Sequence, residues 1–458
     1  MTATVGSKAM LQAPIQGVLW RMTWPVVIGI ATLISFNVVD TFFVGLLGTE
    51  PLAAVSFTFP VTFTLISLTI GLGIGTSAVI ARKTGAGKNT EAHFDGTIAL
   101  IVAAVLMGIL AAAGYLLMDP IFAALQAQSH LLPYIHDYMS WWYAGAVLLV
   151  TPMIGNAILR ASGDTKTPSL IMASGGLLNA IFDPILIFGW GPIPAYGVEG
   201  AAMASVLSWA IGVLLVLSYL IRKQLLGWHP PAGSTRRLEA IRASQQILTI
   251  GLPAAGANML TPLAMAVMTA IIASYGDAAV AAFGVGTRIE SLASIIVLSL
   301  SMSLPPLISQ NFGAQQMSRV GQAYRLALGH VLWIQAFIYL VLVLLAPWIA
   351  AAFSQEPAVA ELIRLFIYIM PLSYGLQGWI ILTNSSLNAL HLPLHALGLS
   401  IVRLFVMFVP LSYLGAWLAD IPGLFWGGVV ANLITAMIAY LWFQRTLTQA
   451  SSTVGNLS

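Results

Sequence analysis

The sequence predicts an all-α integral membrane protein, with twelve transmembrane helices in two pseudo-symmetric six-helix lobes. Of its 458 residues 59% are hydrophobic and only 7% are charged, whereas about 25% of the residues in soluble domains carry a charge. Apolar runs of about 20 residues, long enough to cross a bilayer, recur along the chain. The second half also repeats the pattern of the first.

Each predicted helix is an apolar run that begins and ends near polar or charged residues. The first half contains six such runs, over residues 22–48, 53–81, 94–117, 131–160, 168–189 and 196–222. The second half contains six more, over residues 247–274, 279–309, 321–350, 358–388, 394–416 and 423–444.

The two halves are related by a repeat of constant spacing. Pro253 lies 228 residues after Pro25, and the same separation relates three further pairs: Gly48 and Gly276, Ala53 and Ala281, and Gly85 and Gly313. An even number of helices in each half brings both halves into the membrane from the same side. Parallel repeats of this kind are typical of transporters built from two halves.

The repeat divides the chain into an amino-terminal lobe (1–222), an inter-lobe linker (223–246) and a carboxy-terminal lobe (247–458). The linker is the longest polar stretch and contains Arg236 and Arg237. Most of the 18 Lys and Arg residues fall in loops and helix ends on the linker side. The positive-inside rule therefore predicts that the linker and both termini are cytoplasmic.

Asp40 lies well inside the first apolar span. A low-dielectric environment disfavours a charged carboxylate, so an acid buried there can take up and release a proton near neutral pH. Asn37 precedes it by three residues on the same helical face and could hydrogen-bond it. The alternative is an aspartate near the outer end of the helix that faces water.

Asn179 and Asp183 are four residues apart on the fifth span and point to one helical face. Pro184 follows and frees a backbone carbonyl. Two carboxylates and an amide from different helices can share a proton or bind a hard cation such as Na⁺. The alternative is a structural polar clamp between helices; the presence of Asp40 favours the functional interpretation.

Pro25 lies 15 residues before Asp40 on the same span. An interior proline removes a backbone hydrogen bond and can bend a helix. Pro25 is either a hinge that responds to protonation of Asp40 or a proline in the first turn of the helix. The second interpretation stays open because Pro253, at the corresponding position of the second half, has no acid after it on its span.

A cavity lined by Met and aromatic residues would suit promiscuous binding of amphipathic cations. Candidates for that lining are Asn37, Tyr138, Trp142 and Arg403. Together with Trp141 and Tyr143, Trp142 is more typical of an interfacial aromatic belt. Arg403, alone within the eleventh span, either lines a cavity or is satisfied by backbone carbonyls.

Several function classes lack their motifs. Gly71, Gly73 and Gly75 are not followed by the Lys-Ser/Thr pair of a phosphate loop, so we expect close helix packing there and no direct use of ATP. No cysteine, metal-ligand or catalytic-triad pattern indicates an enzyme, a cofactor or a metal site other than a possible Na⁺ site at Asp40, Asn179 and Asp183. The net charge of +3 is spread over loops at the membrane edge and does not indicate nucleic-acid binding.

Together these motifs resemble the multidrug and toxic compound extrusion (MATE) family over nearly the whole chain. The resemblance rests on Trp24-Pro25 with Asp40, on residues 82–87 and 159–165, and on Asn179-x-x-x-Asp183-Pro184. It implies a two-lobe exporter of the inner membrane, driven by H⁺ or Na⁺ and without a cofactor. The chain is most similar to the DinF-like branch, in which acids of the amino-terminal lobe couple transport. This resemblance also implies that Ser205 completes the cation site.

We therefore expect a secondary active exporter of hydrophobic, often cationic compounds that exchanges them for protons. Na⁺ coupling remains an alternative because the same carboxylates and amide serve either ion. A lipid-linked precursor flippase shares this architecture but needs cations in its cavity, and only Arg403 and Arg288 are available. A channel or a membrane enzyme fits the sequence less well.

Overall fold

The computed structural model describes residues 2–230 and 235–455, and within them the protein is helical, with one isolated β-bridge between Trp190 and Ile193. The first helices are α1 (Thr2–Gln12), α2 (Ile15–Gly45), α3 (Thr49–Gly85), α4 (Asn89–Leu116), α5 (Met118–Ala124), α6 (Leu132–Ala161), α7 (Lys166–Phe188) and α8 (Val198–Arg222). They are followed by α9 (Arg236–Ala273), α10 (Asp277–Ala293), α11 (Ile295–Gly313), α12 (Met317–Phe353), α13 (Pro357–Ile369), α14 (Tyr374–Ala389), α15 (Pro393–Ile401) and α16 (Val409–Gly455). A 3₁₀ turn, η1 (Met370–Ser373), precedes α14, and a π-helix, η2 (Val402–Phe408), precedes α16.

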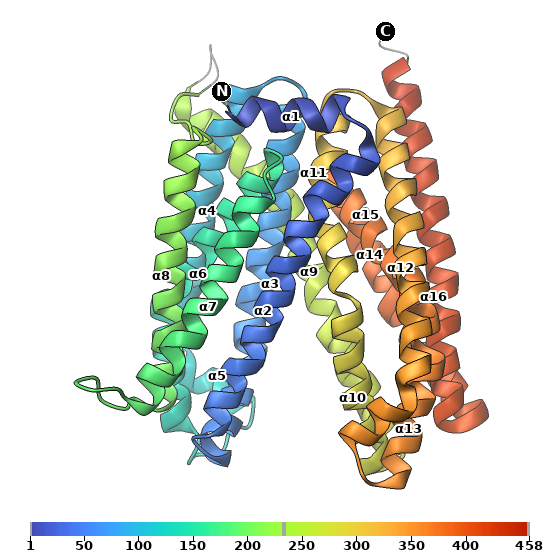
Figure 1. Ribbon diagram of the computed structural model, residues 1–458. Helices are drawn as coiled ribbons and strands as arrows, with labels where there is room; N and C mark the ends of the chain where they lie inside the picture. The colour runs from blue at the N-terminus through green and yellow to red at the C-terminus, as the bar shows by residue number, and fades with distance from the viewer. Residues whose placement is uncertain (1, 231–234, 456–458) are drawn as a thin grey trace. The chain divides into compact units, whose positions relative to one another are not determined.

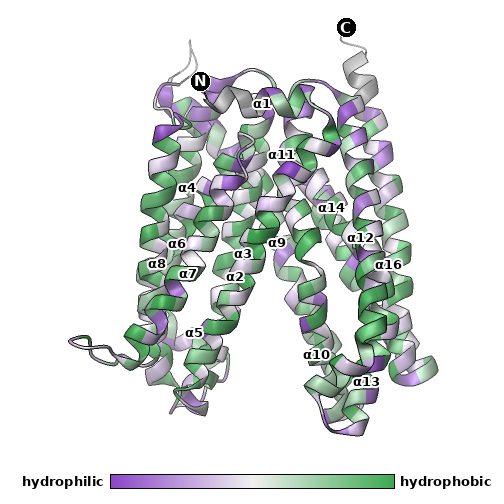
Figure 2. Ribbon diagram, viewed as in Figure 1, coloured by the Kyte–Doolittle hydropathy of each residue, from purple (hydrophilic) through white to green (hydrophobic). Residues whose placement is uncertain are grey.

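The predicted fold class is confirmed. Eleven segments of the described chain are long and apolar enough to span a membrane, and Figure 2 shows their helices hydrophobic along most of their length. The last of these segments, Pro393–Gln449, contains non-helical backbone at Ala419 and Asp420. This break falls between the two final predicted spans, so all twelve are present as helices.

Some elements differ from the simple apolar runs. The eighth predicted span consists of α10 and α11, which meet at Ser294, and the tenth consists of α13, η1 and α14. Two short helices, α1 and α5, lie where the hydropathy pattern predicts none. Hydropathy marks the bilayer-crossing runs and gives little signal for helices outside them.

The chain forms two compact units (Figure 1). The first unit contains residues 2–12 and 24–255, and the second contains residues 13–23 and 256–455. One of the three boundaries falls between α1 and α2, and the other two fall inside long helices. Of these two, one lies in α2 immediately before Trp24-Pro25, and the other lies in α9.

The predicted linker packs on α4 in the first unit over part of its length. Leu225 is buried, and the amide of Gly227 donates hydrogen bonds to the carbonyl of His93 (3.0 Å) and the hydroxyl of Thr97 (3.1 Å). Residues 231–234 lie outside the described chain. From Arg236 onward the segment is already helical and continues as α9.

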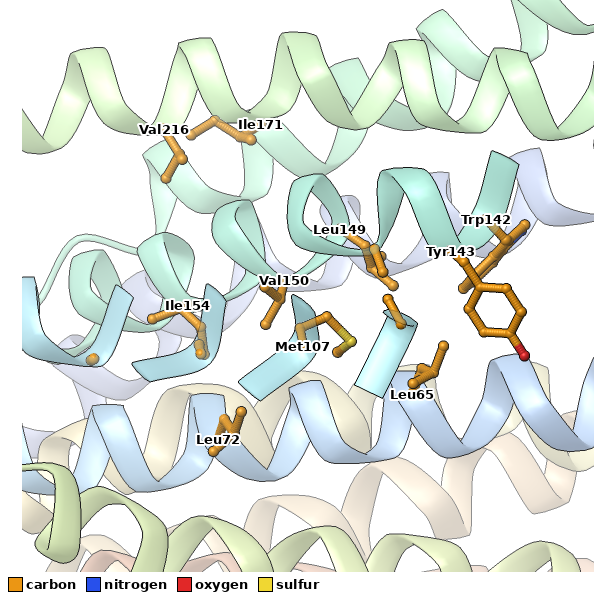
Figure 3. Packing of buried hydrophobic residues seen from close by; sticks show 14 of the residues in the cluster. Leu65, Leu72, Met107, Trp142, Tyr143, Leu149, Val150, Ile154, Ile171 and Val216 are labelled. Atoms are coloured by element: carbon orange, nitrogen blue, oxygen red, sulfur yellow. The ribbon is translucent and has the colours of Figure 1, made fainter. Parts of the chain in front are cut away.

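The core of the first unit surrounds α6, which packs on α3, α4 and α8. Figure 3 shows Val150 and Ile154 of α6 facing Leu72 of α3 and Met107 of α4. Burial of large aliphatic side chains on all these helices stabilises a rigid bundle. This bundle supports the more exposed helices α2 and α7.

The core of the second unit is apolar at the position that corresponds to Asp40. There Met268, only 1% exposed, belongs to a cluster with Phe283, Phe366 and Phe425. The repeat therefore preserves the helices but places an acid at this position in the first unit alone.

Candidate functional site

Helices α2 and α7 lie side by side in the first unit (Figure 1). The ring of Phe36 occupies the space beside Gly176, where a Cβ atom would lie 2.5 Å from the ring. Further along both helices, the rings of Phe43 and Phe188 pack at a centroid distance of 6.2 Å. Residue numbers rise together along this contact, so the two helices run parallel.

Asp40 lies between these two contacts and meets Asp183 of α7, with their carboxyl groups in hydrogen-bonding reach of each other. Asp183 is fully buried. Its Oδ1 accepts a hydrogen bond from Nδ2 of Asn179 at 3.2 Å, whereas its Oδ2 has no donor among the described residues. A carboxylate has only acceptors, so the two acids can hydrogen-bond only when one of them carries a proton.

The amide of Asn179 also links this acid pair to α8. Its Nδ2 lies 3.4 Å from the hydroxyl oxygen of Ser205. Because the amide has two donor hydrogens, it can serve both the carboxyl group and the hydroxyl. Asp40, Asn179, Asp183 and Ser205 therefore form one polar cluster across α2, α7 and α8.

Aromatic residues of α6 lie next to this cluster. Tyr138 is within electrostatic range of both Asp40 and Asp183. One helical turn further, Trp142 is 7% exposed, and its ring packs edge-on against Trp209 at 4.8 Å. Trp142 thus lies inside the first unit and does not form part of a lipid-facing belt.

The remaining candidate residues lie elsewhere or are only partly described. Pro25 is an interior residue of α2, ten positions after its start at Ile15, so the first-turn interpretation is wrong. Asn37 belongs to α2, but its side chain is outside the described part of the structure. Arg403 belongs to the second unit, on η2, within electrostatic range of Glu290.

One buried ion pair was not anticipated from the sequence. Asp95, 2% exposed near the start of α4, lies 2.6 Å from Nζ of Lys83 at the end of α3. Lys83 also lies 3.6 Å from Glu91. The only sequence signal is an acid 12 residues after a lysine, which does not distinguish a buried pair from a solvated helix end.

The cluster at Asp40 can hold and release one positive charge. Two carboxyl groups in a low-dielectric site repel each other when both are ionised, and a proton or a small cation relieves that repulsion. Because the acids come from different helices, the charge state of the pair changes the force between α2 and α7.

Known proteins resemble this chain in sequence and in fold. The sequence profile of the MatE family matches residues 25–185 and 253–414, so the two matched segments begin at the two prolines of the repeat. A protein of Shewanella oneidensis named FAD transporter is 40% identical over 448 residues, which cover 98% of each chain. The multidrug export protein MepA of Staphylococcus haemolyticus is 25% identical over 417 residues, 91% of this chain and 90% of that one.

Among solved structures, the Vibrio cholerae MATE transporter VcmN in the bent form has a TM-score of 0.90 and 33% sequence identity. The match covers 97% of this chain and 99% of that chain.

Proposed function

Because the chain belongs to the MatE family of membrane transporters, we propose that it is a secondary active exporter that exchanges hydrophobic, often cationic compounds for protons by alternating access. The observation that carries the proposal is the polar cluster of Asp40, Asn179, Asp183 and Ser205 in the membrane-spanning helices of the first unit. Ionisable groups inside a membrane cost free energy, and they typically occur along ion pathways.

Asp40 takes up a proton that arrives from the outside and shares it with Asp183. The repulsion between the two carboxylates then disappears, and α2 bends at Pro25, where the proline interrupts its backbone hydrogen bonds. The bend narrows the substrate cavity of the amino-terminal lobe, and substrate leaves on the outer side. Loss of the proton to the cytoplasm resets the helix.

We favour H⁺ over Na⁺ as the coupling ion because Na⁺ binds several oxygen ligands. Besides the two carboxyl groups, the cluster offers the Asn179 amide and the Ser205 hydroxyl.

We also assign the chain to the DinF-like branch, with lobes at 1–222 and 247–458 joined by the linker, and both termini on the cytoplasmic side of the inner membrane. The apolar cluster around Met268 supports the branch, because coupling acids then belong to the amino-terminal lobe alone.

A second candidate substrate class is an anionic flavin nucleotide. The relative from Shewanella oneidensis that is 40% identical is named FAD transporter, whereas the multidrug export protein MepA of Staphylococcus haemolyticus is 25% identical. Export of either substrate can use the same coupling site, so substrate and ion are tested separately.

Transport in proteoliposomes tests the coupling. Ethidium or FAD export is driven first by a proton gradient and then by a sodium gradient, with Asp40→Asn beside the wild type. Asp119→Asn, which changes an acid exposed at 77%, serves as the matched control. We expect export on the proton gradient, its loss in Asp40→Asn and full activity in Asp119→Asn.

Full coupled export by Asp40→Asn would contradict the role of the cluster. Export on the sodium gradient alone would mean that the same site couples to Na⁺ in place of H⁺. Export that responds to neither gradient would favour the lipid flippase.

A further inference from the structure

The second unit contains its own group of buried polar residues, which the coupling cycle does not use. Glu290 lies on α10, Tyr374 and Gln377 lie on α14, and Arg403 lies on η2. Nε2 of Gln377 donates a hydrogen bond to Oε1 of Glu290 at 2.7 Å. Glu290 is within electrostatic range of both Arg403 and Tyr374.

Two donors of this group have no partner among the described residues. Nε of Arg403 and the hydroxyl of Tyr374 are both buried without a hydrogen bond, and Tyr374 is only 3% exposed. A buried donor left unpaired costs free energy. The group therefore has capacity for one more acceptor.

The protein does not enclose the whole group. Arg403, Glu290 and Gln377 are half-buried, whereas Nε of Arg403 and the hydroxyl of Tyr374 are buried. Glu290 is held by Gln377 and supplies the counter-charge that a cation in a membrane requires. The π-helical turn of η2 widens the helix at Arg403, and such turns often occur at functional sites.

We propose that Arg403 and Tyr374 form a binding point for an oxyanion, a phosphate or carboxylate group of an anionic substrate, and that Glu290 is the internal counter-ion which this group displaces electrostatically. A planar guanidinium matches the two oxygens of such a group, and the tyrosine hydroxyl adds a third donor. The biological meaning rests on the proposed export function, but binding is measurable without any gradient.

The test uses three flavins that share one fluorescent ring. Riboflavin carries no phosphate, FMN carries one and FAD carries two, and their binding to the purified protein in maltoside detergent is followed by fluorescence anisotropy. Arg403→Gln should weaken FMN and FAD binding on the order of ten- to a hundredfold and leave riboflavin binding unchanged. Glu290→Gln should strengthen FMN binding, because it removes a neighbouring negative charge.

The opposite signs separate ligand recognition from a structural role. If the Arg403–Glu290 interaction only held the fold together, both variants would weaken binding and lower the unfolding midpoint. Arg403→Lys keeps the charge but lacks the planar fork, so it should bind FMN with intermediate affinity. Arg288 is an exposed arginine on α10, the helix that carries Glu290. Arg288→Gln is therefore the matched control and should behave as wild type.

Equal losses for riboflavin and FMN in Arg403→Gln, or no loss for either, would overturn the proposal. Phosphatidylglycerol added to the detergent distinguishes a lipid headgroup from a soluble substrate. If it displaces FMN from the wild type through Arg403, the oxyanion belongs to a lipid and the substrate assignment is wrong. Because binding is measured without a gradient and on variants outside the cluster of Asp40, Asn179, Asp183 and Ser205, failure here is distinguishable from failure of the proton-coupled cycle.

Discussion

At the scale of single residues, Asp164 shows how a charged side chain holds a loop between membrane helices. It lies between α6 and α7 and accepts hydrogen bonds from Nζ of Lys223, from the hydroxyl of Thr167 and from the amide of Thr167 (3.1 Å). Burial raises the pKa of Asp164, but the hydrogen bonds from Lys223 and Thr167 outweigh burial and keep the pKa below its usual value.

A pKa that is lower in the folded protein means that the ionised form stabilises the fold. This stabilisation is fully present above the unfolded pKa of about 3.9 and is lost as the pH falls through the lower folded value. Asp164→Asn should therefore lower the unfolding free energy by about 1.5–3 kcal/mol at pH 7, and the difference from wild type should vanish under strongly acidic conditions. Thermal unfolding of both proteins in detergent, at pH 7 and in strong acid, measures this difference in stability.

The exposed pair of Asp119 and His136 provides the control for that measurement. An ion pair at the surface contributes about 0–1 kcal/mol, so Asp119→Asn should have little effect at either pH. A destabilisation of Asp164→Asn that persists unchanged in acid would contradict the role assigned to its charge.

At the scale of elements, glycines allow two helices of the first unit, α3 and α9, to approach closely. A Cβ atom on Gly71 of α3 would lie 2.3 Å from the carbonyl oxygen of Gly251 of α9, and one on Gly75 would lie 2.4 Å from that of Ile247. Gly73, between them, points away, and its Cβ would lie 3.8 Å from Ala157 of α6. Alternate glycines thus allow the backbones of α3 and α9 to touch, as small residues do between membrane helices.

Gly71→Ala and Gly75→Ala should therefore push α9 away from α3 and destabilise the protein by about 1–3 kcal/mol each. Gly73→Ala, the matched control, should be neutral or slightly stabilising, because its methyl group meets only ordinary van der Waals distances. Unfolding midpoints of the three purified variants decide this. Equal destabilisation by all three would indicate a general loss of helix flexibility, with no specific backbone contact.

At the scale of the whole molecule, the distribution of cations predicts which ends of the helices face the cytoplasm. The chain has no cysteine, so single cysteines can report the position of each loop. Gln128→Cys, exposed between α5 and α6, should react with a membrane-impermeant maleimide on intact cells. Lys88→Cys, exposed between α3 and α4, should react only after the membrane is opened.

Labelling of Lys88→Cys on intact cells, with Gln128→Cys protected, would invert the proposed topology. The wild type without cysteine gives the background of the measurement.

The sequence by itself determined the helical membrane fold, the positions of the spans, the repeat and the presence of Asp40 and Asp183 inside the spans. These properties depend on composition and on spacing along the chain, so they are visible before the chain folds. The division of α2 and of α9 between the two units could not be predicted from the sequence. A continuous helical pattern does not indicate which neighbours each part of the helix packs against.

Only the tertiary structure decided how the polar residues combine. It brings Asp40 to Asp183 across 143 positions of sequence and joins Ser205 to them through Asn179, and it places Glu290 and Arg403 in one group. The physical reason is that side chains distant in sequence meet only through helix packing. The packing of Phe36 beside Gly176, which aligns α2 with α7, is such a contact, and hydropathy carries no information about it.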